Sequence, residues 1–83
     1  MKKMWAKVMK ENRIKKDCVI EVEHGTTLYD NLKEACYILN LETPIILKKH
    51  KLEIAEYNIT RFRKTDFVDS IDFDYLQIEY FEL

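Results

Sequence analysis

Glycine and proline are nearly absent from this chain of 83 residues, which contains one of each, Gly25 and Pro44. So little glycine and proline leaves few flexible joints. The length leaves no room for a second domain and predicts a single domain, residues 1–83, near the low end of what folds unaided. Hydrophobic residues make up 47% of the chain and charged residues 35%, with a net charge of −1. That balance predicts a folded globular protein and not a disordered one.

Cysteine is also scarce, and no apolar run is long enough for a transmembrane helix or opens the chain as a signal peptide. Cys18 and Cys36 fall at apolar positions of a predicted strand and helix, which favours small core side chains over a disulfide or redox pair. Two cysteines cannot supply the four thiolates of a ferredoxin-type cluster. The simplest interpretation is a reduced, cytoplasmic protein with no cofactor.

Alternating residues predict a β-hairpin from Met4 to Val22. In its first strand Met4, Ala6 and Val8 share the face that we expect to meet the core. Polar residues 11–13 form the turn. The return strand presents one apolar face, interrupted only by Lys16 near the turn. The apolar residues predicted on that face are Ile14, Cys18, Ile20 and Val22.

An amphipathic helix is predicted from Thr27 to Asn40, and it is the strongest pattern in the chain. Thr27 and Asp30 have the spacing of a capping box, and Asn40 suits a left-handed C-cap. The apolar stripe consists of Leu28, Leu32, Ala35, Cys36 and Leu39. The opposite, polar side is predicted to carry Asn31, Lys33 and Glu34.

The second half of the chain has weaker patterns. Pro44 precedes an apolar run, residues 45–47, that predicts a buried strand. Residues 48–59 fit either a helix, with Leu52, Ala55 and Ile59 on one side, or a strand, and we favour a short helix or turn. Phe62, between two arginines, predicts a brief strand, and Thr65 is the expected N-cap of a short turn. A closing strand runs from Asp74 to Glu82, apolar on both faces as expected for the middle of a sheet.

A hairpin, one long helix and a central C-terminal strand, in that order, predict an α+β fold of the β-grasp, or ubiquitin-like, type. In that fold the first and last strands are parallel neighbours. The chain ends in residues 81–83, Phe-Glu-Leu, without the paired glycines that ubiquitin-like modifiers use for activation. The analogy therefore concerns the fold and implies no function.

From Pro44 onward the sequence resembles a group of small, uncharacterised bacterial proteins. The residues that carry the resemblance are Pro44, Leu47, Lys49-His50, Arg61-Phe62, Asp66-Phe67 and the closing run from Ser70 to Glu79, which includes Asp72-Phe73-Asp74. An acidic residue often follows the histidine in that group, whereas Lys51 stands here. The resemblance implies a bacterial housekeeping or mobile-element protein and supplies no catalytic residue.

Charge is divided into blocks along the chain. Residues 1–16 and 48–64 are mainly basic, and residues 66–83 hold only acidic charges. The two basic segments support one alternative function, a nucleic-acid-associated protein. The acidic segment supports another, a surface that imitates phosphates. The third interpretation is that the blocks neutralise one another within the fold, for example Lys3 and Lys7 beside Glu79 and Glu82.

Candidates for metal binding or acid–base chemistry are few. His50 and Glu53 would share a helix face at a spacing of three residues, and His24 is the only other histidine. A surface histidine beside lysines is the simpler interpretation of His50. The aspartates at 69, 72 and 74 lack the spacing of a calcium loop, and no serine or threonine has an identifiable base. We therefore predict no catalytic, cofactor-binding or metal-binding residue.

The aromatic residues suggest a different kind of site. Trp5 and Phe81 fall on the strand faces opposite the predicted core, so they would form an apolar patch on the open side of the sheet, flanked by Lys7 and Glu79. The alternative is a second core layer covered by residues 48–64. We predict a non-enzymatic binding or regulatory module that contacts a protein partner or a second copy of itself, with no membrane contact. Nucleic-acid association is the second hypothesis, and an enzyme with an unrecognised site is the third.

Overall fold

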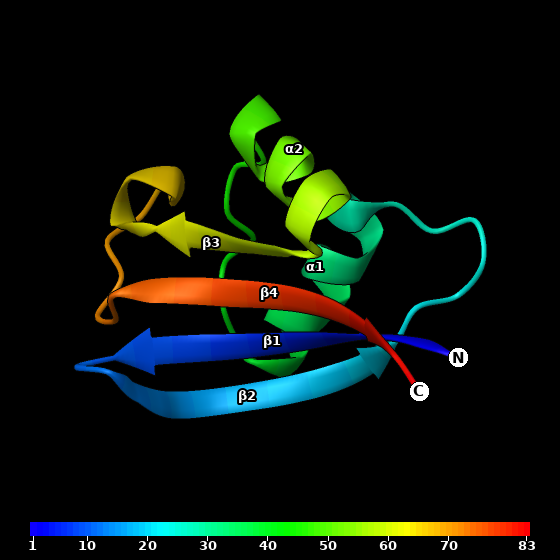
Figure 1. Ribbon diagram of the computed structural model, residues 1–83. Coiled ribbons are helices and arrows are strands. Elements are labelled where there is room, and N and C mark those ends of the chain that lie inside the picture. Colours follow the sequence, from blue (N-terminus) through cyan, green and yellow to red (C-terminus); the bar gives the residue numbers. More distant parts are fainter.

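Four antiparallel strands and two helices make up the computed structural model, which describes residues 1–83 and confirms the α+β class (Figure 1). The elements, in chain order, are β1 (Lys2–Lys10), β2 (Arg13–Glu21), α1 (Leu28–Ile38), α2 (Lys48–Tyr57), β3 (Ile59–Arg63), the short 3-10 helix η1 (Lys64–Asp66) and β4 (Tyr75–Glu82). Neither helix is long and apolar enough to cross a membrane.

The hairpin of β1 and β2 forms as predicted. Glu11 and Asn12 both adopt positive φ angles, 52° and 63°, as a two-residue turn between twisted strands requires. The predicted place of Ile14 is wrong. The register shifts between Val8 and Met9, so that Met9 lies opposite Ile14 and Lys15 is the extra residue of a bulge. The bulge turns Ile14 to the outer face, where 48% of its surface is exposed.

Helix α1 has both predicted caps. Thr27 and Asp30 exchange the two hydrogen bonds of a capping box. Hydrogen bonds from the Thr27 backbone N–H and then from its side chain lower the pKa of the Asp30 carboxyl. At the other end Asn40 has a φ of 58°, and the Leu41 N–H donates to the Cys36 carbonyl, 2.8 Å away. The Lys16 ammonium, on the inner face of β2, donates to the carbonyl of Leu39 at 2.6 Å. Lys16 thus contacts the negative end of the helix dipole.

Asn31 is not on the polar side of α1, as predicted, but buried. Its side-chain amide donates to the Tyr80 hydroxyl at 3.0 Å and its oxygen accepts from Thr26 at 3.3 Å. The helix stripe therefore includes one polar residue, which is satisfied by β4 and by the segment before α1. Such pairing is what permits a polar side chain in the interior.

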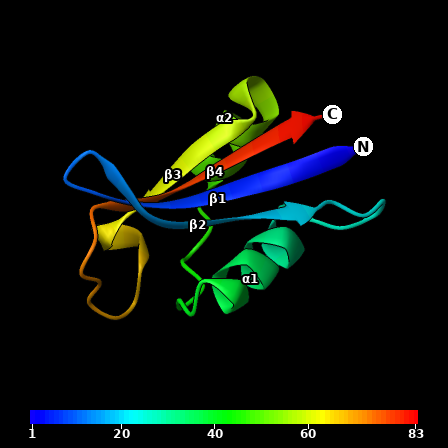
Figure 2. The same cartoon turned by 90° about the horizontal axis from the view of Figure 1, so that it is seen from below.

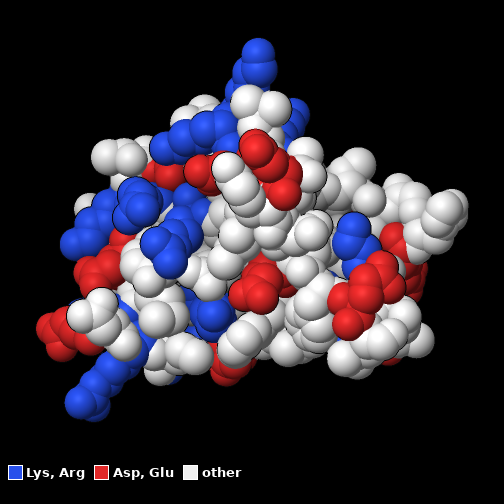
Figure 3. All heavy atoms as spheres, in the orientation of Figure 1, with Lys and Arg blue, Asp and Glu red and all other residues white.

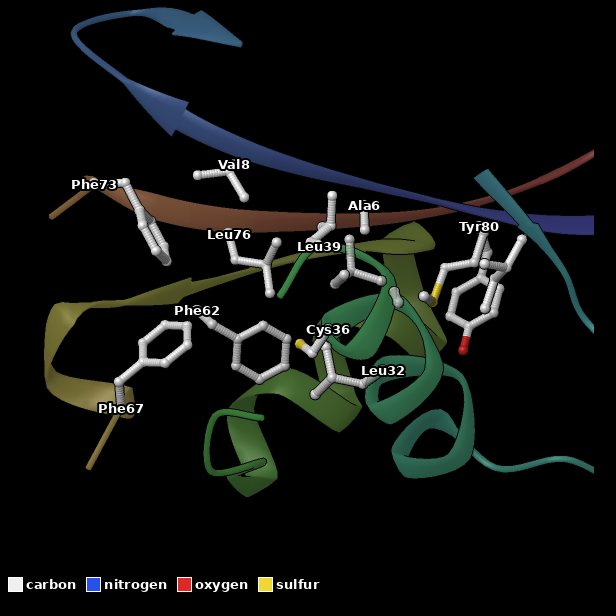
Figure 4. Packing of buried hydrophobic residues seen from close by; sticks show 14 residues of the cluster. Ala6, Val8, Leu32, Cys36, Leu39, Phe62, Phe67, Phe73, Leu76 and Tyr80 are labelled. Carbon is white, nitrogen blue, oxygen red and sulfur yellow. The ribbon is translucent and has the colours of Figure 1, made fainter. Parts of the chain in front are cut away.

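The core lies between the inner face of the sheet and the two helices (Figure 4). In this view Phe62 of β3 points toward Leu32 and Cys36 of α1, beneath Leu76 of β4. The rings of Phe67 and Phe73 close one end of the core in an edge-on arrangement, with centroids 5.6 Å apart. The buried hydrophobic residues are Met4, Ala6, Val8, Ile20, Leu32, Ala35, Cys36, Leu39, Phe62, Phe67, Phe73, Leu76, Ile78 and Tyr80.

The strand order is β2-β1-β4-β3, so the C-terminal strand is central and next to β1, as predicted. The predicted parallel pairing of these two strands is wrong, because β1 and β4 are antiparallel. The cause is the second helix. Helix α1, which lies on one side of the sheet in Figure 2, runs toward the hairpin turn, and α2 carries the chain back again. β3 consequently starts at the end of the sheet where β2 finishes, on the opposite edge, and runs in the same direction as β1. β4 then runs antiparallel to β1, and the β-grasp pairing is not formed.

Two local predictions, one between the two helices and one after β3, are also wrong. Residues 45–47 form no strand; Ile45 and Leu47 are exposed, and the Ile45 N–H donates to the Asp66 carbonyl. The turn after β3 begins earlier than predicted, at Lys64. There the Asp66 carboxylate accepts from the Arg63 N–H at 2.9 Å, which replaces the predicted cap by Thr65.

Candidate functional site

The outer face of the sheet is the candidate site, because both helices pack on the other face. His50 and Ile54 of α2 pack against the same core as α1, so residues 48–57 do not cover the outer face. Pairing between the strands arranges the outer residues in rows. One row joins Val19, Trp5, Glu79 and Ile59, and the next joins Asp17, Lys7, Gln77 and Arg61.

Trp5 is held in place at the centre of this face. Its indole N–H donates to the Asp17 carboxylate at 2.8 Å, and the Lys7 ammonium lies 4.0 Å from the centre of its ring. Trp5 remains partly exposed. A large ring that is already fixed loses little conformational freedom on binding, which is a property of anchor residues at interfaces.

The structure brings the four predicted site residues together. Glu79 lies directly opposite Trp5, and Lys3 lies opposite Phe81, so Phe81 is a diagonal neighbour of Trp5. Phe81 is half-buried, and Glu79 has no ion pair. The expected pairing of Lys7 with Glu79 is therefore absent, since Lys7 stacks on the indole ring instead.

The two sides of the outer face carry opposite charges. β2 contributes Asp17 and Glu21, whereas β3 contributes Arg61 and Arg63. The Arg61 Nε donates to Gln77 at 2.9 Å, and both guanidinium groups lie over the Tyr75 ring, at 4.8 and 5.8 Å. Neither arginine has a carboxylate within ion-pair distance. In Figure 3, Lys and Arg side chains gather over β3 and α2.

The basic segment 1–16 does not form a continuous cationic surface. Lys3 pairs with Glu21 at 3.6 Å, Lys15 with Asp72 at 2.9 Å, and Lys16 points inward to α1. The hydrogen bond from Lys15 lowers the pKa of the Asp72 carboxyl. Lys3 and Lys15 are therefore neutralised by carboxylates, whereas four other basic side chains, Lys2, Lys7, Lys10 and Arg13, have no carboxylate within ion-pair distance.

The acidic segment is used internally as well. Asp66 is buried, Asp72 binds Lys15, and the Asp74 carboxylate accepts from the Glu11 N–H at 2.9 Å. Asp72 and Asp74 thus attach the hairpin turn to the loop before β4. Of the four aspartates in the segment 66–83, only Asp69 keeps its carboxylate free of such contacts, which leaves little for a surface that imitates phosphates.

His50 is fully buried, so its expected place on the surface is wrong. Its Nδ1 accepts from the Leu47 N–H at 2.9 Å, and its ring packs 4.2 Å from that of Phe62. Nε2 lies 3.4 Å from the Asp66 carboxylate, but the direction does not suit a hydrogen bond, and Nε2 has no other partner. His50 therefore caps α2 from the third helical position, a role usually filled by glutamate or glutamine.

Neither of the other candidate ligands joins His50. Glu53 accepts a short hydrogen bond, 2.5 Å, from the Thr60 hydroxyl, and His24 lies exposed in the turn before α1. No group of three or more histidine, cysteine or acidic side chains is close enough to hold a metal ion.

The two thiols are free and lie near each other. Burial raises the pKa of Cys36 to about 12, with a smaller effect from Cys18. Burial, followed by the charges of Asp17 and Glu34, also raises the pKa of Cys18. Raised pKa values keep both groups as thiols near neutral pH, which makes them poor nucleophiles.

In comparisons with known proteins, no protein-family model, curated protein or solved structure matches this chain.

Proposed function

We propose that the protein is a small, non-enzymatic binding module that acts through protein contacts on the outer face of its sheet, with a second copy of the chain as the partner. The observation that carries this proposal is the uncovered face itself, with Trp5 fixed by Asp17 and Lys7 beside Phe81. Fixed aromatic side chains near the centre of a face are the residues that most often dominate binding energy.

Charge complementarity supports a second copy. A two-fold axis parallel to the strands would place two outer faces together, with β2 of each copy over β3 of the other. Asp17 would then face Arg61 of the second copy, and Lys3 would face Phe81 of the second copy. The same patch serves both partners, as a two-fold interface requires, and unlike charges meet on both sides.

The size of the face predicts a weak dimer. Strands about 4.8 Å apart with a rise of about 3.4 Å per residue give the four-stranded face an area of about 500 Å². Two copies would then bury about 1,000 Å², below the roughly 1,600 Å² of a standard stable interface. We therefore expect dimers that form and dissociate with concentration in the micromolar range.

The test replaces Trp5 and Phe81 with serine and follows the molecular mass by sedimentation as concentration rises. We expect the wild type to dimerise and the W5S/F81S variant to remain a monomer with its fold intact by circular dichroism. The matched control is Tyr29→Ser with Tyr37→Ser, which removes two exposed aromatic rings from α1. That control should dimerise like the wild type.

A charge exchange tests the orientation of the two copies. Arg61→Glu should weaken the dimer, and adding Asp17→Lys should restore part of the affinity. A wild-type protein that stays monomeric at millimolar concentration would overturn the proposal, as would dimers of W5S/F81S as strong as those of the wild type.

Nucleic-acid association is the second candidate function. It is favoured by Arg61, Arg63 and Lys49, which have no carboxylate partners and line one groove. The two arginines also lie over the Tyr75 ring. The internal contacts of Lys3, Lys15 and Lys16 weigh against it, because binding to phosphates depends on free positive charge. Salt-dependent retention on single-stranded DNA or heparin, abolished in an R61E/R63E variant, would favour this candidate over self-association.

We also propose that the protein is cytoplasmic and that it is related to the small bacterial proteins that its second half resembles. The free thiols of Cys18 and Cys36 support a reducing compartment. Several residues that carry the resemblance also meet in space, since His50 contacts Leu47, Phe62 and Asp66. Thiol labelling of the protein in intact cells would test the location.

A further inference from the structure

A groove lies along the free edge of β3, between this strand and α2. It has a volume of about 260 Å³. Its helix side is formed by Lys49, Glu53 and Tyr57, which are spaced four residues apart and so share one stripe of α2. Its strand side is formed by Ile59, Thr60, Arg61 and Arg63.

The backbone of β3 leaves hydrogen-bonding groups free at this groove. β3 pairs only with β4, and the Tyr80 N–H donates to the Asn58 carbonyl. In an antiparallel pair the bonded residues alternate, so Thr60 and Phe62 bond to β4. The N–H and C=O groups of Ile59 and Arg61 therefore point outward, toward the open edge.

The groove is also positively charged. Lys49, Arg61 and Arg63 have no carboxylate within ion-pair distance. The one acidic lining residue, Glu53, is bound to the Thr60 hydroxyl. An anionic ligand would therefore meet three free cations on the two sides of one exposed strand edge.

We infer that the groove binds an acidic peptide segment in extended conformation, which adds to β3 as a fifth strand. The open edge offers alternating donors and acceptors, which a peptide backbone matches and a phosphate backbone, with acceptors only, does not. Side chains of an added strand alternate between faces, so one set would lie beside Arg61 and Arg63 and the other beside Lys49 and Tyr57. Acidic residues at every second position would suit the arginine side.

The probe is a fluorescent seven-residue peptide with glutamate at alternate positions and valine between them, and binding is measured by anisotropy. Arg61→Ala should weaken binding by removing a charge. Arg61→Pro also removes the outward N–H, which β4 does not use, and proline is tolerated at such edge positions. We expect the proline variant to bind about tenfold more weakly than the alanine variant, the effect of one lost backbone hydrogen bond in a charged site.

Three further measurements keep the test independent of the folding of the proline variant. A peptide with N-methyl groups on the edge-facing amides should bind at least tenfold more weakly, Lys49→Glu should weaken binding, and W5S/F81S should bind like the wild type. Equal affinity for the methylated peptide would overturn the inference. So would tighter binding of a single-stranded oligonucleotide than of the peptide, or loss of binding in W5S/F81S, which would move the site to the outer face.

Discussion

The two faces of the sheet are built from neighbouring residues of the same strands but have opposite characters. On β1, Met4, Ala6 and Val8 are fully buried under the helices, whereas Trp5 and Lys7 between them are partly exposed. Trp5 contacts both Lys7 and Asp17. The inner face thus supplies the burial that stabilises the fold. The outer face is covered by neither helix and contributes less to stability, so substitutions on the two faces should have separable effects.

The largest expected effect is on the inner face. Leu32→Ala should lower the free energy of unfolding by about 2–5 kcal/mol, because it removes buried methyl groups and leaves a cavity under the sheet. Urea unfolding followed by circular dichroism measures the loss. Tyr37→Ala, at a position that is 86% exposed on the same helix, is the control and should have little effect. A loss below about 0.5 kcal/mol for Leu32→Ala would contradict the packing of α1.

His50→Ala should have the next largest effect, a loss of about 1–3 kcal/mol, because the Leu47 N–H loses its acceptor and the ring of Phe62 loses a neighbour. His50→Gln keeps an acceptor at the same helical position and should lose less. Lys51→Ala, at the exposed position next in the chain, serves as the control. Equal stability of His50→Ala and Lys51→Ala would show that His50 does not stabilise the interior.

The first half of the fold was predictable because its signals are local. The alternation around Val8 and the Thr27–Asp30 spacing depend only on residues close in sequence. The same holds for the turn at residues 11–12 and for the cap at Asn40. Leu32 and Cys36 lie where the stripe predicts. Ile14 and Asn31 do not follow the period, because a bulge turns Ile14 outward and Tyr80 pairs with the buried Asn31 amide.

The structure of the second half could not be predicted in the same way, because it depends on contacts between residues that are distant in sequence. In α2 the inward positions are His50 and Ile54, whereas Leu52 of the predicted stripe is exposed. From the sequence alone, His50 is expected at the surface, because its neighbours Phe62 and Asp66 are distant in the chain. The direction of β4 relative to β1 likewise depended on whether α2 made a second pass across the sheet, which the ambiguous pattern of residues 48–59 left open.

The candidate site was predictable in part. Strand alternation alone placed Trp5 and Phe81 on the outer face, and the structure puts Lys7 and Glu79 beside them. The charge distribution across the face depended on strand order and register. The strand order and register of the structure show that Asp17 holds the indole ring of Trp5. They also show that the arginines of β3 lie at the opposite edge from the carboxylates of β2.

The smallest expected effect gives the sharpest comparison of the two faces, since it uses adjacent residues of β2. Val19 lies on the outer face and is 51% exposed, whereas Ile20 lies on the inner face and is 4% exposed. Val19→Thr should change the free energy of unfolding by no more than about 0.5 kcal/mol, because the new hydroxyl can reach water. Ile20→Thr, its control, should lose about 1–3 kcal/mol, because there the hydroxyl is buried without a partner. If urea unfolding instead shows equal losses at the two positions, Val19 and its cross-strand neighbour Trp5 belong to a second core layer, and the outer face is not free to bind.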